Sequence, residues 1–205
     1  MNLFLPCPPS ATLTPIAKKV CDKRFNQVVK LVFGIIGTDK PFAVGTPITA
    51  KASWDALLAL DTAVVTNYVE NFVIPGSDSI EEGGETNINR MPELIDGANV
   101  QATWNNRGIT AAIQLAMKKL TIYSAIMPGV SELGFMAINV DGDVIHDTTE
   151  YWIPVFNLFT GDIDIKAEKG KANGAMGKFS LLYGWSDNIT TSTPAFKILN
   201  TYPAA

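Results

Sequence analysis

The chain has 205 residues, of which 47% are hydrophobic and 18% are charged, and its formal net charge is −4. This length fits one domain, or one domain with a small appendage. The acidic balance argues against tight nucleic-acid binding, which needs a concentrated basic face. Because the longest apolar runs have only about nine residues, we expect no membrane-spanning helix, which needs ~20. We also expect no signal peptide, and two cysteines are too few for a disulfide scaffold or a zinc site.

The low charged fraction and the positive mean hydropathy of +0.15 allow two interpretations. Either neighbouring copies cover much of the surface, or Ala, Val and Ile are simply abundant in the core. The pattern along the chain bears on this choice.

Residues 1–24 are proline-rich and then mildly basic, which predicts an extended N-terminal arm. Residues 25–205 are predicted to form one β-sandwich domain. It begins with a strand in "NQVVKLVFGIIG", which a turn at "TDKP" ends. The segment "PITAKASWDALLALD" changes to helical spacing, and "TAVVTNYVENFVIP" returns to two short strands.

The segment of about 76–90, "GSDSIEEGGETNINR", is acidic, contains paired glycines and has almost no apolar residue. Such a segment cannot bury enough surface to order itself, so we expect a long loop that either is catalytic or is completed by something outside the chain. After it, Asp96–Gly97 in "MPELIDGANVQATW" is predicted to form a hairpin turn.

The strongest helical pattern runs from about 108 to 126. Ile113, Met117 and Leu120 share one face, and Lys118 and Lys119 lie on the other. This spacing predicts one amphipathic helix that flanks a sheet.

The last third of the chain has β character, with a predicted hairpin turn at Asp141–Gly142. Short strands with Gly- and Asn-rich connections follow, and they indicate a mainly β (α+β) fold, a two-sheet β-sandwich or barrel. The expected strands lie in "TEYWIPVFNLF", "DIDIKAE", "GKFSLLYGW" and "AFKILN".

Candidate catalytic residues are few. A small hydrolase using Asp143, His146 and Glu81 is one alternative, but Asp147 follows His146 in a strand and points to the opposite face. No Ser or Cys lies in a nucleophile elbow, and "EKGKANGAMGKF" lacks the first glycine and the final Ser or Thr of a phosphate-binding loop. We therefore expect no enzyme and no cofactor or metal, although clustered glutamates in 76–90 also allow a weak cation site.

The four tryptophans, Trp54, Trp104, Trp152 and Trp185, are scattered and are predicted to be core or interface anchors. The alternative is a ligand- or carbohydrate-binding sandwich, for which Trp104, Trp152 and Trp185 would have to share one exposed face.

The basic connection containing Lys166, Lys169, Lys171 and Lys178 offers a partner for the acidic loop of another copy. We expect the contacts between subunits to involve both segments. The predicted interface residues are Ser79, Glu81, Glu82, Glu85, Asn87, Arg90, Lys169, Lys171 and Lys178.

The order of arm, two-sheet core, flanking helix and unsupported loop, with the text "PITAKASWDALLAL" and "VVTNYVENFVIPGSDSIEEGGETN" within roughly 30–130, resembles the tail-tube family of tailed bacteriophages. The resemblance implies a structural virion protein without catalytic residues, assembled in the cytoplasm of the host bacterium and not bound to a membrane. The alternatives in the same class are a head–tail connector, a stopper and a capsid-decorating protein.

The family further implies rings of identical subunits, commonly hexameric, whose inner sheets join into one barrel. DNA would pass through an acidic lumen without specific binding. The loop at 76–90 would bridge to the adjacent ring, the arm 1–24 or the C-terminal tail would reach onto a neighbour, and other tail or neck proteins would be partners.

Overall fold

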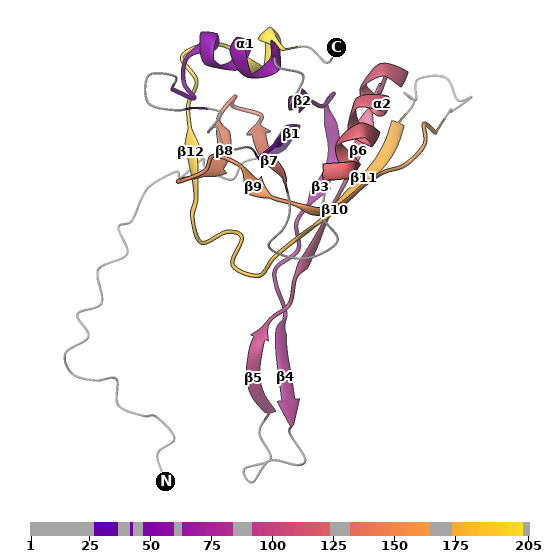
Figure 1. Ribbon diagram of the computed structural model, residues 1–205, viewed down its shortest axis with the longest axis vertical. Coiled ribbons are helices and arrows are strands. Elements are labelled where there is room, and N and C mark those ends of the chain that lie inside the picture. The colour runs from indigo at the N-terminus through magenta and orange to yellow at the C-terminus, as the bar shows by residue number, and fades with distance from the viewer. Residues whose placement is uncertain are drawn as a thin grey trace, which may run out of the picture.

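A computed structural model describes residues 27–36, 42, 47–59, 63–83, 92–123, 132–164 and 174–202. Within these ranges the fold is mainly β, with two antiparallel sheets and short helices, as expected from the sequence. The arm predicted at 1–24 lies outside the described residues. Figure 1 shows the two sheets in the body of the molecule and a separate pair of strands that projects from it.

The larger sheet has the order β12-β8-β7-β1-β2, and β9 pairs with β7 beside this path. Its strands are β12 (Ile189–Ser192), β8 (Val144–Asp147), β7 (Leu133–Asn139), β1 (Val28–Ile35), β2 (Ala63–Val65) and β9 (Ile153–Pro154).

The smaller sheet has the order β10-β11-β6-β3, and a third, two-stranded unit pairs β4 with β5. The strands are β10 (Phe156–Thr160), β11 (Gly174–Leu181), β6 (Val100–Arg107), β3 (Val69–Val73), β4 (Ser79–Gly83) and β5 (Pro92–Gly97).

The six-stranded sheet is covered on both faces. In β1, Leu31 and Phe33 belong to the core between the two sheets, whereas Val32 belongs to a second core on the opposite face. Every residue of β7 is buried, because its side chains also enter both cores. Because side chains alternate between the faces of a strand, two covered faces require the nearly continuous apolar sequence "LGFMAIN".

Aromatic rings join the two sheets. Phe33 of β1 lies 5.6 Å from Trp104 of β6, and Phe135 of β7 lies 4.9 Å from Phe179 of β11, measured between ring centroids. Offset and tilted ring pairs at these distances stabilise a core beyond the area that they bury. This cluster fixes how the four-stranded sheet sits on the six-stranded one.

Helix α2 (Ala111–Leu120) packs against this core with Ile113, Met117 and Leu120, and a 3-10 turn (Thr121–Tyr123) follows it. It contacts β10, β1 and β2, which confirms the predicted flanking helix. The helix begins later than the predicted residue 108, because the Thr110 hydroxyl caps it by accepting from the Ile113 amide at 3.3 Å.

The second core lies under helices α1 (Lys51–Ala59) and α3 (Ile198–Thr201), which Figure 1 shows side by side. Trp54 and Trp152 are its largest side chains, and the indole N–H of Trp54 donates to the Ile48 carbonyl at 2.7 Å. The molecule therefore has three layers: α1 with α3, the six-stranded sheet and the four-stranded sheet. The sequence indicated the helical spacing of α1, but it did not predict that α1 and α3 together cover a sheet.

Buried Lys30 of β1 holds the C-terminal helix. Its ammonium donates to the carbonyls of Leu199 and Tyr202 at 3.2 and 2.6 Å, in and just after α3. Burial lowers the pKa of Lys30 below its usual range. These bonds satisfy carbonyls at a helix end, and they help to explain why "AFKILN", which was predicted as a strand, leads into a helix instead.

Two turn predictions have opposite outcomes. The hairpin at Asp141–Gly142 is confirmed: Gly142 has φ +87°, and β7 pairs with β8. The hairpin turn at Asp96–Gly97 is wrong, since Asp96 lies inside β5 and pairs with Ile80 of β4. The loop predicted at 76–90 contains strand β4, because residues 79–83 pair with β5. Strand β12 was not predicted from the sequence. The strand predicted in "DIDIKAE" is wrong for its described part, which forms only an isolated bridge from Asp164 to Gly174.

Glycines make room for two buried tryptophans. Gly34 and Gly134 face each other across β1 and β7, and a Cβ atom at either would overlap Trp152. A Cβ atom at Gly177 of β11 would likewise overlap the indole of Trp104 on β6. Glycine in a strand often marks such a close approach.

We predict that Gly177→Ala and Gly34→Ala each destabilise the fold by about 1–3 kcal/mol, the range for overpacking a tight core. Gly76→Ala is the matched control, since nothing lies within 4 Å of a Cβ atom there. Urea unfolding measures all three variants. Unfolding free energies of the two core variants that equal that of the control would contradict this packing.

Candidate assembly surface

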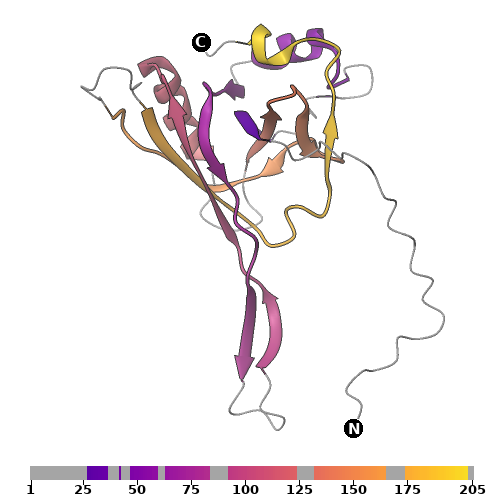
Figure 2. The same cartoon turned by 180° about the vertical axis from the view of Figure 1, so that it is seen from behind.

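The pair β4–β5 forms a ribbon that continues β3 and β6 beyond the four-stranded sheet. Figures 1 and 2 show it extending away from both sheets in opposite views. Its register runs from Ser79 opposite Gly97 to Gly83 opposite Pro92, with one irregularity between Ile80 and Glu81. No third strand pairs with it in the described part of the chain. An isolated two-stranded hairpin is at best marginally stable in water, because three or more strands or a packed helix normally stabilise such an element.

The root of the ribbon is tied to the body. The Ala98 amide donates to the Asp78 carbonyl at 2.7 Å and closes the ribbon at its base, and the Tyr183 amide of the body donates to Asn99 Oδ1 at 3.1 Å. Gly97 is buried, and a Cβ atom there would overlap the Tyr183 ring. The ribbon therefore leaves the body at a fixed point, which the sequence analysis did not identify.

The ribbon concentrates the negative charge of the chain. Residues 76–98, the ribbon segment, contain six acidic residues and one basic residue, whereas the other 182 residues contain 14 acidic and 15 basic residues. The segment thus has a net charge of −5 and the remainder +1, which together give the −4 of the chain. Glu82 and Glu93 also occupy facing register positions. A segment this acidic suits a basic partner.

The four-stranded sheet has an exposed face opposite the core. In β6 the side chains alternate strictly between buried and exposed positions. Three large apolar residues, Val73, Phe159 and Met176, are 54%, 47% and 52% exposed at sites on β3, β10 and β11. The other exposed residues of β3, β6 and β10 are Glu70, Asn71, Gln101, Thr103, Asn105, Arg107 and Asn157.

Both edge strands of this sheet are irregular. The register of β3 shifts between Glu70 and Val73, where Asn71 has φ +55°, and that of β10 shifts between Phe156 and Phe159, where Asn157 has φ +52°. Asn tolerates this left-handed conformation better than most residues. Bulges of this kind make an exposed edge less open to pairing with an arbitrary strand.

The predicted interface residues fall into three groups. Ser79, Glu81 and Glu82 lie in β4, on the ribbon. Lys178 lies in β11 on the body, with its ammonium 5.6 Å from the centroid of the Phe159 ring. The remaining residues lie outside the described part of the chain: Glu85, Asn87, Arg90, Lys169 and Lys171.

The candidate hydrolase residues do not form a catalytic arrangement. His146 of β8 is 3% exposed; its Nδ1 lies 2.7 Å from the Asp147 carbonyl, to which it must donate, and its Nε2 lies 2.8 Å from the Ser192 hydroxyl. The Asp143 carboxylate accepts from Thr193 at 2.6 Å, and Glu81 lies on the ribbon. Among the described residues, no three His, Cys, Asp or Glu side chains are placed to hold a metal ion.

The tryptophans do not form a sugar-binding platform in the described part of the chain. Trp54, Trp104 and Trp152 are buried, and Trp185 is half-buried against the core between the sheets. Their interpretation as core anchors is therefore confirmed for the first three.

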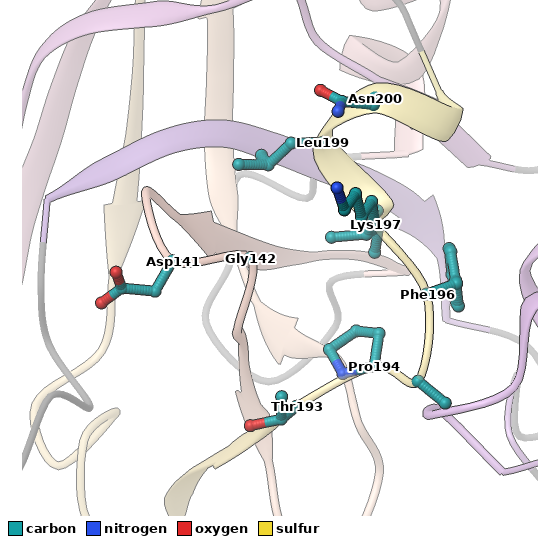
Figure 3. Close-up of a pocket in the computed structure, with 10 residues that line it drawn as sticks. Asp141, Gly142, Thr193, Pro194, Phe196, Lys197, Leu199 and Asn200 are labelled. Carbon is teal, nitrogen blue, oxygen red and sulfur yellow. The ribbon is translucent and has the colours of Figure 1, made fainter.

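A surface groove of about 470 Å³ lies between the β7–β8 turn and the segment leading into α3. Figure 3 shows that its labelled side chains do not converge on one point. Asp141 and Lys197 give it opposite charges, and Pro194 and Phe196 give it apolar surface. This mixture has no arrangement typical of a catalytic centre.

No described helix is long and apolar enough to cross a membrane. No protein-family model, no curated protein and no solved structure matches the chain. The geometry of the described residues is therefore the basis for a functional proposal.

We predict that the stability of the fold decreases as the pH falls below about 6.5, the usual pKa of histidine. The pKa of His146 is lowered in the folded chain, mainly because the imidazole is buried. Between that lowered pKa and 6.5, the unfolded chain therefore binds more protons than the folded chain. The free energy of unfolding then drops by up to about 1.4 kcal/mol per pH unit in this window.

Urea unfolding at pH 8, 7, 6 and 5 measures this effect, with His146→Gln as the matched variant that cannot titrate. The carboxylates titrate in both proteins, so the difference between the two curves isolates His146. A difference that stays constant from pH 8 to pH 5 would contradict the prediction.

Proposed function

We propose that this chain is a structural virion protein of a tailed bacteriophage, whose copies assemble into rings of a tail tube or of the tail or neck around a conduit for DNA. The observation that carries the proposal is the ribbon β4–β5, which extends from the body as two strands that pair only with each other among the described residues. The family resemblance of the sequence gives this projection its proposed role as a contact between rings.

The energetics of the ribbon favour a partner. Fixing the backbone of one residue costs about 1–2 kcal/mol of conformational entropy, and a two-stranded unit on its own recovers little of it. A second copy that packs on the ribbon would supply the missing contacts. Segments completed in this way order as an assembly forms.

The four-stranded sheet suits closure into a ring. Each neighbouring pair in β10-β11-β6-β3 is antiparallel, so the two edge strands β10 and β3 also run in opposite directions. Rotation about a common axis would place β3 of one copy beside β10 of the next, again antiparallel. Repetition of this step removes the exposed edges and gives one continuous barrel.

The size of such a barrel suits a conduit. Barrels of about 16–18 strands already enclose a water-filled channel, and six copies would contribute on the order of 24 strands. The commonly hexameric state that the resemblance implies is thus compatible with four strands per copy.

On this proposal, the exposed face of the four-stranded sheet lines the channel. Its described charges are few: Glu70, Arg107, which pairs with Glu70 at 3.2 Å, and Lys178. Gln101, Thr103 and Asn105 of β6 give the rest of the face an uncharged polar character. Passing DNA would meet few fixed cations to hold its phosphates. The acidic lumen expected from the net charge gives way here to a nearly neutral one, because the negative charge is concentrated in the ribbon.

We predict that the purified chain forms rings or tubes, visible by negative-stain microscopy and by mass photometry. A variant in which Asn-Gly replaces residues 79–97 should keep the fold, since the Asp78–Ala98 bond at the ribbon root can close on a two-residue turn. This variant should give single rings without stacking, because it lacks the proposed contact between rings.

Thermal unfolding of the shortened variant is the control for its fold. A wild-type chain that stays monomeric at all salt and protein concentrations would overturn the proposed function. A shortened variant that stacks as well as the wild type would overturn the role of the ribbon.

A further inference from the structure

Helix α2 has an outer face whose composition differs from that of an ordinary solvated helix. Leu115 and Ile122 are 56% and 83% exposed, and Lys119 lies between them at helical spacing on the same side. We call these three residues the outer helix face. Tyr123 is also 40% exposed beside them. Large apolar side chains gathered on one exposed face are typical of an interaction site.

The ribbon and the outer helix face lie at opposite ends of the molecule. Figure 1, drawn with the longest axis vertical, shows the ribbon at the bottom and α2 near the top, and Figure 2 shows the same separation from behind. The ribbon of a chain therefore points away from its own α2. When copies are stacked along this axis, the ribbon of one copy approaches the α2 end of the next.

The two surfaces are complementary in charge and in apolar content. The ribbon segment has a net charge of −5, and its strands contain Ile80, Leu94 and Ile95 but no basic residue. The last turn of α2 carries Lys118 and Lys119, of which Lys118 pairs with exposed Asp162 at 2.5 Å. Opposite potentials on two surfaces steer their encounter and fix their register.

We propose that the ribbon of one copy docks on the outer helix face of a second copy, an inference that rests on the proposed function and names the receiving surface for its contact between rings. The interface joins two different surfaces of the same chain. Such a head-to-tail contact, repeated by translation, does not close on itself and extends into a stack. It also brings Lys119 to a ribbon whose strands have Glu82 and Glu93 at facing register positions.

The test is a charge exchange in the full-length chain. Lys119→Glu and Glu82→Lys should each reduce stacking by about tenfold, a change that corresponds to ~1.4 kcal/mol. The double variant should restore it, because the opposite charges again face each other. Lys197→Glu, the same change at an exposed site on the groove of Figure 3, is the matched control and should stack as the wild type does.

Ile122→Ser tests the apolar part of the contact. Because Ile122 is 83% exposed, the variant should unfold at the same temperature as the wild type yet stack less. The length distribution of stacks in negative-stain images and sedimentation velocity measure the effect.

Carboxyl-to-amine crosslinking of mixed isotope-labelled and unlabelled chains gives a readout that does not need rings. The expected product joins an acidic residue of the ribbon segment in one copy to Lys118 or Lys119 in another. Rings that form but do not stack in Lys119→Glu, with restoration in the double variant, support the inference.

Unchanged stacking in both Lys119→Glu and Ile122→Ser overturns the inference and leaves the rings of the proposed function intact. If the wild type forms no rings, the proposed function fails. The crosslink alone then tests whether the ribbon docks on the outer helix face. Its presence between copies supports the docking, and its absence at high protein concentration overturns it.

Discussion

One long hairpin, formed by β3 and β4 on one side and by β5 and β6 on the other, extends beyond the two packed sheets, and this is the main constraint on the account. Strands β3 and β6 form part of a sheet whose inner face is packed, but their continuations β4 and β5 pass beyond the last neighbouring strand. Backbone pairing continues there between β4 and β5, and no other described strand joins them. Because burial supplies most of the stability of a sheet, the ribbon is the part of the fold that most needs another molecule.

The body, by contrast, satisfies its own strands. The six-stranded sheet is covered by α1 and α3 on one face and by the four-stranded sheet on the other, and Lys30 ties the C-terminal helix to β1. Among the described residues, the outer face of the four-stranded sheet and the outer helix face carry exposed apolar side chains, and the ribbon projects beyond both sheets. The low charged fraction of the chain fits a molecule in which other copies cover such surfaces.

The sequence predicted the parts of the fold that are encoded locally. Alternation and a strong turn signal identified β7 and β8 around Asp141–Gly142, and helical spacing identified α2. The ribbon was missed because "SIEEG" has little apolar content and its partner strand lies about ten residues away. Pairings such as Trp104 over Gly177, or Tyr183 over Gly97, depend on cross-strand neighbours that local patterns do not specify. The acidic character of the candidate surface was visible in the sequence, but its place on a projecting ribbon was not.

Amide hydrogen exchange at 79–83 and 92–97, compared between dispersed and assembled chains, tests most directly whether the ribbon is completed by another copy. The account predicts fast exchange of these amides in the dispersed chain, while β6 and β7 stay protected, and slowing on the order of a hundredfold on assembly. Ribbon amides that are already as protected as those of β7 in the dispersed chain, with no change on assembly, would contradict it.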